Sequence, residues 1–141
     1  MINDNEQIKD LALSPILNQQ FLRASYYFRD ITASGYASLT TETETTIISA
    51  VASRYLDLIY VSGSTTSDGA VSVDLRSGTG GSVLDTIVIP GTGVIGNMWH
   101  KYDVPLLAAE QATPWTAQVS GDVSNTTITI TMVAIKNSKR N

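Results

Sequence analysis

Residues 55–76 read YLDLIYVSGSTTSDGAVSVDLR, two strand-like runs on either side of a polar loop that ends in Asp-Gly. In the second run Val71, Val73 and Leu75 alternate with polar residues, which is the period of a strand with one buried face and one solvated face. The first run alternates less cleanly. We predict that this stretch forms a β-hairpin and that most of the downstream chain repeats the same design.

Further strand-like runs follow at even spacing, with Gly, Pro, Asn, Asp or Ser between them. Including the two above, the runs lie at 46–51, 55–62, 70–76, 83–89, 98–104, 115–120 and 126–135. No helical pattern separates them, which argues against alternating strands and helices. The sequence therefore predicts an all-β fold, an antiparallel β-sandwich or a barrel, with eight or nine strands if the N-terminal aromatic stretch joins it.

The N-terminal segment differs from the rest of the chain. Residues 1–20 contain the one plausible short helix, and residues 20–31 are aromatic and suit an extended arm or a first strand. We expect two parts, an arm at 1–32 (short helix plus extended segment) and a β-sandwich domain at 33–141. A short helix is marginal alone, so the arm must dock on its own sandwich or on a neighbouring chain.

Composition excludes several classes of protein. The chain has 141 residues, no cysteine and a net charge of −4, so neither a disulfide framework nor general phosphate binding is expected. The basic tail, Lys136 to Arg140, suits a solvated end. No apolar run is long enough for a membrane helix, and the first thirty residues lack a signal-peptide pattern. We expect a soluble protein with no nucleic-acid and no membrane partner.

The sequence contains residues of the kind used in cofactor and metal sites, but their neighbours do not fit such a site. Residues 91–96, GTGVIG, match a dinucleotide fingerprint, but a strand rather than a helix is expected to follow them. His100 is the only histidine and is expected to be a partly exposed strand residue, so a zinc site cannot be assembled. We therefore expect no cofactor and no metal.

Catalysis would need carboxylates that converge in space. Each candidate alternates with apolar residues in its own strand, so the simplest interpretation is that each faces solvent, and we expect no enzyme activity. The candidates are Asp57, Asp74, Asp85 and Asp103.

The aromatic residues keep a sugar-binding site as an alternative. Trp99, Tyr102 and Trp115 could form a platform for a sugar ring. Trp115 alternates with Ala117 and Val119, however, which favours a core position. Trp99 and Tyr102 have opposite parity and cannot share one strand face.

Several segments of the body of the chain form a recognisable series. They are TTIISAVA at 45–52, LDL at 56–58, DGAVSVDL at 68–75, RSGTGG at 76–81, Pro90, VPL at 104–106, VSGD at 119–122 and the Thr-rich final strand. Together these segments resemble small β-sandwich virion proteins of tailed bacteriophages, of the capsid decoration or head auxiliary type. The resemblance covers about Thr45 to Asn137, and residues 1–32 have no counterpart in it.

The resemblance implies a jelly-roll-like module, commonly trimeric, used as a decoration (cement) protein or as a fibre component. Arms in such proteins often reach a neighbouring subunit or the capsid. The implied location is the virion, assembled in the host cytoplasm, and the implied partners are the major capsid protein or other virion subunits. The alternative is a receptor- or carbohydrate-binding module of a head or tail fibre, using loops at 91–98 and 105–114. The arm residues expected to bind the partner are Ile2, Ile8, Leu11, Leu13, Ile16, Leu17 and Phe21.

Overall fold

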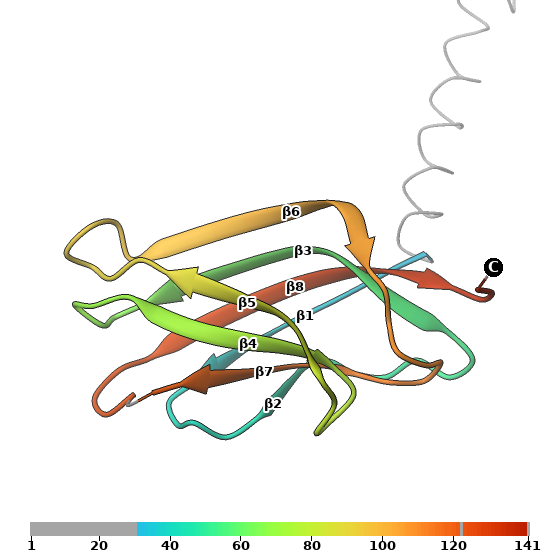
Figure 1. Cartoon of the computed structure of the whole chain (residues 1–141), viewed down its shortest axis with the longest axis horizontal. Coiled ribbons are helices and arrows are strands. Elements are labelled where there is room, and N and C mark those ends of the chain that lie inside the picture. The colour runs from blue at the N-terminus through green and yellow to red at the C-terminus, as the bar shows by residue number, and fades with distance from the viewer. Residues whose placement is uncertain (1–30, 122, 141) are drawn as a thin grey trace, which may run out of the picture. The chain divides into compact units, whose positions relative to one another are not determined.

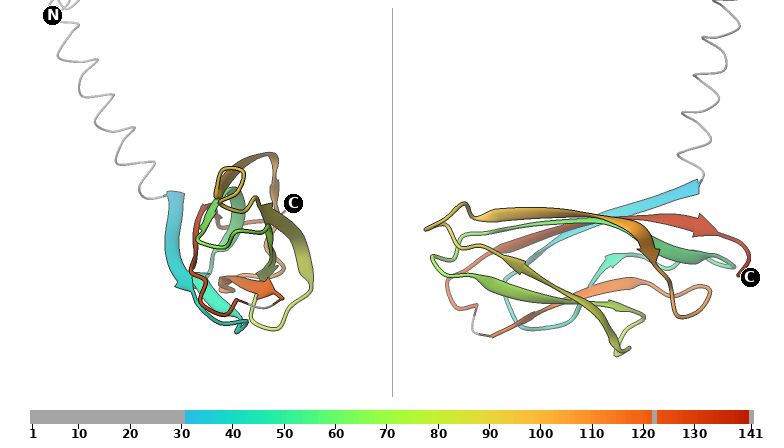
Figure 2. Two further views of the ribbon diagram at one scale, coloured as in Figure 1. Left: turned by 90° about the vertical axis from the view of Figure 1, so that its left-hand side faces the viewer. Right: turned by 45° about the horizontal axis from the view of Figure 1, so that its top comes forward.

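The computed structural model describes residues 31–121 and 123–140, and the residues from Thr32 onward form one compact unit. Within it eight strands form two antiparallel four-stranded sheets, which lie one over the other in Figures 1 and 2. The strands are β1 (Thr32–Leu39), β2 (Thr45–Ile48), β3 (Tyr55–Thr65), β4 (Val71–Ser77), β5 (Val83–Ile89), β6 (Asn97–Leu106), β7 (Trp115–Ser120) and β8 (Ile128–Asn137).

The strand order is that of a jelly roll. One sheet has the order β1-β8-β3-β6 and the other β2-β7-β4-β5, so that successive strands change sheet at every connection except the one from β4 to β5. Every pairing in both sheets is antiparallel. The predicted all-β class, antiparallel sandwich and jelly-roll-like arrangement are therefore confirmed.

The predicted hairpin at 55–76 is wrong. Its two strands form as expected, but β3 pairs with β6 and β8, whereas β4 pairs with β5 and β7. Both edges of β3 are thus occupied, and the loop at 66–70 crosses from one sheet to the other. Turn residues such as Asp68-Gly69 satisfy the backbone of a crossing loop as well as that of a hairpin, so local sequence cannot distinguish the two.

The core lies between the sheets and follows the period-2 pattern. Ile128, Ile130 and Met132 of β8 are fully buried, as their alternation with threonines indicates. Trp115 is also fully buried, which confirms its core position, and its indole Nε1 donates a hydrogen bond to the Leu56 carbonyl oxygen at 2.6 Å. This bond joins β7 of one sheet to β3 of the other.

The predicted arm, residues 1–32, lies almost wholly outside the described residues, and its prediction stays untested. The first described strand, β1, begins at Thr32 and includes part of residues 36–46, whose Ser- and Thr-rich sequence predicts a solvated strand or a linker. No helix in the described part of the chain is long and apolar enough to span a membrane.

Close contact between β1 and β2 depends on a glycine. A Cβ atom on Gly35 would lie 1.8 Å from the carbonyl oxygen of Ile47, which is far inside van der Waals contact. The opposing atom is backbone and cannot rotate away. Any side chain at this position would therefore force β2 away from β1 at one margin of the sandwich.

We expect Gly35→Ala to lower the free energy of unfolding by about 3 kcal/mol, because the backbone must shift to accept the new methyl group. Chemical denaturation monitored by circular dichroism measures this. Gly69→Ala is the matched control, since a Cβ atom there meets nothing within 4 Å, and it should leave stability nearly unchanged. Equal stability of the two variants would contradict the contact.

Candidate functional site

Three of the four acidic residues considered for catalysis bind separate partners, and the fourth, Asp103, is exposed on β6. Asp74 accepts a hydrogen bond from the Thr86 hydroxyl at 2.8 Å, and Asp85 accepts one from the Tyr102 hydroxyl at 2.6 Å. Asp57 has a third set of partners, described below. Within residues 31–121 and 123–140, no group of three or more His, Asp or Glu side chains could hold a metal ion.

Asp57 is not the solvent-facing residue that its strand pattern predicted. It is 2% exposed, and it forms an ion pair with Arg140 through bonds of 2.7 and 2.8 Å. The Ala108 amide also donates to it, at 2.9 Å, as does the Asn137 side chain. The guanidinium of Arg140 stacks over the Tyr55 ring at 4.2 Å, so this part of the basic tail is packed rather than solvated.

These contacts decide the charge state of Asp57. Burial alone would raise the pKa of Asp57, but the hydrogen bonds from Arg140, Ala108 and Asn137 outweigh burial and hold the pKa below its ordinary value of 3.8. An ionised carboxylate with every partner inside the protein has no free lone pair facing a ligand. The cluster therefore fastens the C-terminal tail to β3 and contributes stability.

Tyr102 links the edge strands of the two sheets. Its hydroxyl donates to Asp85 of β5, while its ring meets His100 edge-on with centroids 4.5 Å apart. Burial, and then the Asp85 carboxylate, raise the pKa of the Tyr102 hydroxyl, so it stays protonated as a donor. His100 is exposed on β6, slightly more than the partly exposed position expected of it.

The glycine motif at 91–96 is a loop, as predicted, although it joins two sheets rather than two strands of a hairpin. A Cβ on Gly91 would lie 2.0 Å from the Asp68 carbonyl oxygen, and Gly96 has a φ of 78°. The amides of Val94, Ile95 and Gly96 all donate to the Gly91 carbonyl oxygen. The glycines therefore permit a tight turn and a close approach of two loops, and β6 follows directly with no helix.

Of the three aromatic residues considered for a sugar platform, only Trp99 is available. Its side chain is 69% exposed on β6, whereas Trp115 is in the core and Tyr102 points towards Asp85. The opposite orientation of Trp99 and Tyr102 confirms the parity argument.

Trp99 belongs to a broad surface that we call the open face, the outward side of the β1-β8-β3-β6 sheet. The register aligns its outward side chains in three rows that cross all four strands. In strand order β1-β8-β3-β6, the rows are Ser38-Thr129-Ser64-Asn97, Tyr36-Thr131-Ser62-Trp99 and Ser34-Val133-Tyr60-Lys101.

The open face has many hydroxyl groups and little charge. Among the twelve residues of these rows, Lys101 is the one cation and none carries a carboxylate, while Asp103 is exposed at the next position of the same parity on β6. Among the described residues, the side chains of Ser62, Thr131 and Ser64 have no hydrogen-bond partner. Exposed aromatic rings stand at both ends of the middle row, Tyr36 at 75% and Trp99 at 69% exposure.

Polar side chains on the outward side of the other sheet are paired more extensively than on the open face, where the hydroxyls of Ser38 and Thr129 lie 3.4 Å apart. Arg76 donates to Gln118 at 2.8 Å and lies 3.9 Å from Asp74. Glu44 accepts hydrogen bonds from the Gly80 amide and the Thr116 hydroxyl. Polar groups that already have hydrogen-bond partners have fewer donors and acceptors left for a ligand. The open face is therefore the better candidate for a binding surface.

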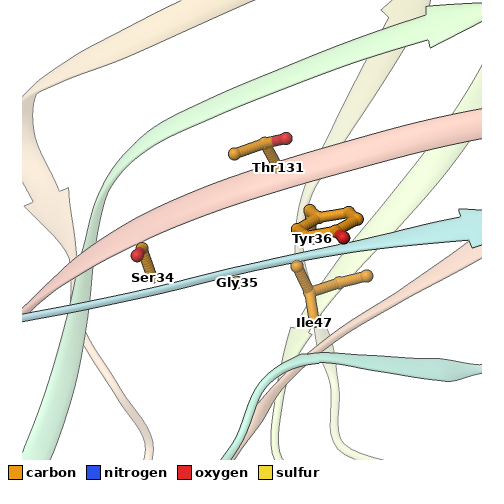
Figure 3. A pocket seen from close by; sticks show the side chains of 5 residues that line it. All are labelled: Ser34, Gly35, Tyr36, Ile47 and Thr131. Atoms are coloured by element: carbon orange, nitrogen blue, oxygen red, sulfur yellow. The ribbon is translucent and has the colours of Figure 1, made fainter.

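A shallow hollow of about 450 Å³ lies along β1 at one margin of the open face. Figure 3 shows Tyr36 beside Ile47 of β2, Ser34 further along β1, and Thr131 on the neighbouring strand β8. Gly35 completes the lining. The hollow is open to solvent, and three of its five lining residues carry hydroxyl groups.

The predicted partner-binding residues of the arm all lie outside the described residues, so their role stays a prediction. They are Ile2, Ile8, Leu11, Leu13, Ile16, Leu17 and Phe21.

The importance of Tyr36 was missed at the sequence level. Its stretch was interpreted as a solvated strand or linker, and the parity of Tyr36 with Ser34 and Ser38 signals an outward aromatic residue. Its alignment with Trp99, 63 positions later in the chain, depends on two intervening strands.

Comparison with known proteins places the fold among jelly-roll chains. No protein-family model matches the sequence, and no curated protein matches it. A chain in the acid-stable capsid of Helicobacter pylori bacteriophage KHP30 is similar at a TM-score of 0.53 and 10% identity, over 74% of this chain and 87% of that one.

Two other solved structures are similar at lower scores. They are a chain of the cyanophage Pam1 capsid (TM-score 0.46, 9% identity, 74% and 82% coverage) and the PRD1 vertex protein P5 (0.42, 11%, 76% and 97%). At these identities the KHP30 likeness shows a shared fold, and the protein is in structural class a small jelly-roll β-sandwich.

We expect Arg140→Ala to lower the free energy of unfolding at pH 7 by about 3 kcal/mol, since it leaves the buried Asp57 carboxylate without its cation. Lys139→Ala, which removes an exposed neighbouring charge, should change little. Urea denaturation of both variants measures the difference.

The same pair of proteins tests the pH dependence. The folded-state pKa of Asp57 is depressed, so its contribution is fully present above the unfolded pKa and is lost as pH falls through the folded value. The stability gap between the wild type and Arg140→Ala should therefore shrink below about pH 4. A gap that stays constant down to pH 2 would contradict a charged pair at this site.

Proposed function

We propose that this chain is a structural virion protein of a tailed phage, a capsid decoration (cement) protein that binds the outside of the head and stabilises it. The observation that carries the proposal is the jelly-roll strand order, which this chain shares with a chain of the KHP30 capsid at a TM-score of 0.53. The sequence resemblance to small virion proteins points the same way. The protein acts as a trimer, is assembled in the host cytoplasm and has the major capsid protein or other virion subunits as partners.

The surface chemistry supports a binding role of this kind. A protein that reinforces a shell needs broad contact surfaces with few charges at their centre rather than an enclosed pocket. The open face offers such a surface. Exposed apolar side chains on the loop at 91–96 add to it, with Val94 at 82% exposure. Catalysis has no part in this function, so we propose that the protein is not an enzyme.

The N-terminal segment supplies the apolar part of the contact in this proposal. Its sequence carries seven apolar residues that a partner surface can bury, each worth about 1.5–3 kcal/mol when a large side chain is fully covered. They are Ile2, Ile8, Leu11, Leu13, Ile16, Leu17 and Phe21. Anchoring by a short segment leaves the sandwich free to contact neighbouring subunits.

The first experiment combines light scattering with co-sedimentation on capsids from the same source. We expect a trimer that pellets with capsids. A variant lacking residues 1–20 should keep the β-sheet circular dichroism spectrum and lose capsid binding. A monomer that stays in the supernatant would refute the decoration function, and full binding by the shortened variant would refute the role of the segment alone.

A second candidate function is a receptor- or carbohydrate-binding module of a head or tail fibre. The observation that favours it is Trp99, a large aromatic side chain that stands 69% exposed on an edge strand next to the loop at 91–96. Aromatic faces of this kind can stack on the apolar faces of sugar rings.

A glycan array probed with the wild type and with Trp99→Ala tests the second candidate. We expect a restricted set of glycans to bind the wild type, and that binding should fall at least about tenfold in the variant, because stacking is removed. Because Trp99 is exposed, the variant should keep the wild-type fold, which its circular dichroism spectrum verifies. Silence of the wild type across a broad array would count against this function.

A further inference from the structure

The middle row of the open face, Tyr36-Thr131-Ser62-Trp99, places two exposed aromatic rings at opposite margins of one sheet. The two residues are 63 positions apart in sequence and come into line only through the pairings of β1 with β8, β8 with β3, and β3 with β6. Three strand spacings of about 4.8 Å put their backbones roughly 14 Å apart. A single sugar ring cannot reach both residues, whereas a chain of several rings can.

Hydrogen-bonding groups fill the interval between the rings. Thr131 and Ser62 lie in the same row, and among the described residues neither side chain has a hydrogen-bond partner. Hydroxyl groups can donate and accept, so they match the hydroxyls of a saccharide without fixing one orientation. A ligand that stacks at both ends would therefore meet unused polar groups along its middle.

Residues near both ends of the middle row can also form hydrogen bonds with a polar ligand. On β6, Trp99 is flanked on the same face by Asn97 and Lys101, an amide and an ammonium group. On β1, Tyr36 borders the hollow of about 450 Å³, whose lining includes Ser34 and Thr131 (Figure 3). One end thus offers a stacking site with flanking hydrogen-bond donors, and the other offers a concave site.

The charge of the open face selects the class of ligand. Nucleic acids and strongly acidic polysaccharides need several cations, and Lys101 is the single cation among the twelve residues of the face. A cationic ligand would need several carboxylates, whereas the twelve residues have none and the exposed Asp103, at the next position of the same parity on β6, supplies a single one. A neutral chain of sugars needs neither, because its hydroxyls bind uncharged groups and its ring faces stack on aromatic side chains.

We propose that the open face binds a neutral oligosaccharide that lies across the four strands, from Trp99 to Tyr36, with one terminal sugar in the hollow beside β1. This inference rests on the second candidate function and gives that function its ligand class and its direction of binding.

The test uses the full chain and titrates it with gluco-, xylo- and N-acetylchito-oligosaccharides of increasing length by isothermal titration calorimetry. For at least one series we expect affinity to rise with length and then level off. For the longest member of that series, Trp99→Ala and Tyr36→Ala should each weaken binding at least about tenfold, while Tyr36→Ala should leave the disaccharide unaffected. Val88→Ala, an exposed apolar position on the other sheet, is the matched control and should bind like the wild type.

Three other outcomes would contradict this inference, and they can be told apart. If Trp99→Ala abolishes binding while Tyr36→Ala and chain length make no difference, the second candidate function stands but the site is confined to Trp99. If no series binds, and the two substitutions instead change the oligomeric mass in light scattering, a second copy of the chain occupies the face. If no series binds and the mass is unchanged, neither occupant is correct.

Discussion

The indole of Trp115 joins the two sheets, and this packing of one sheet on the other decides which side of each sheet faces outward. It is fully buried in β7, and its Nε1 donates to the Leu56 carbonyl oxygen in β3 at 2.6 Å. Because each sheet buries one side against the other, the remaining sides must face outward. Gly35 brings β1 close to β2, and the Tyr102 to Asp85 bond spans β6 and β5. These contacts hold the strand edges that border the open face.

The two outward sides carry opposite chemistry although both are rich in polar residues. On the β2-β7-β4-β5 sheet, polar side chains such as Arg76 and Gln118 bind one another, so their hydrogen-bonding capacity is used within the protein. On the open face, Ser62 and Thr131 have no such partners among the described residues. The two sides differ in how many polar side chains bond to one another, rather than in polarity. A side whose donors and acceptors are unused can bind a ligand or a neighbouring subunit.

Buried charge in this fold serves stability. Asp57 and Arg140 form a pair that is supported by a backbone amide and by Asn137, and this arrangement fastens the end of the chain to β3. Such a pair is costly to break, because one partner alone would remain charged and desolvated. Of the carboxylates that could have suggested catalysis, Asp57 is engaged in this way and Asp74 and Asp85 bind a neighbouring hydroxyl, whereas Asp103 is exposed on β6. The binding functions proposed for the protein therefore depend on its surfaces, with attachment through the N-terminal segment and ligand binding on the open face.

The sequence by itself determined where most strands lie and which side of them is buried, because period-2 alternation is a local property of residues such as Ile128, Ile130 and Met132. It also determined that Trp115 is in the core and that residues 91–96 form a loop. Only the tertiary structure decided which strands pair. A loop between sheets and a hairpin turn need the same residue types, so the stretch at 55–76 was misinterpreted. The partner of Asp57 is 83 positions away, and the row from Tyr36 to Trp99 depends on the register of four strands. Contacts of this range carry no local signal in one chain.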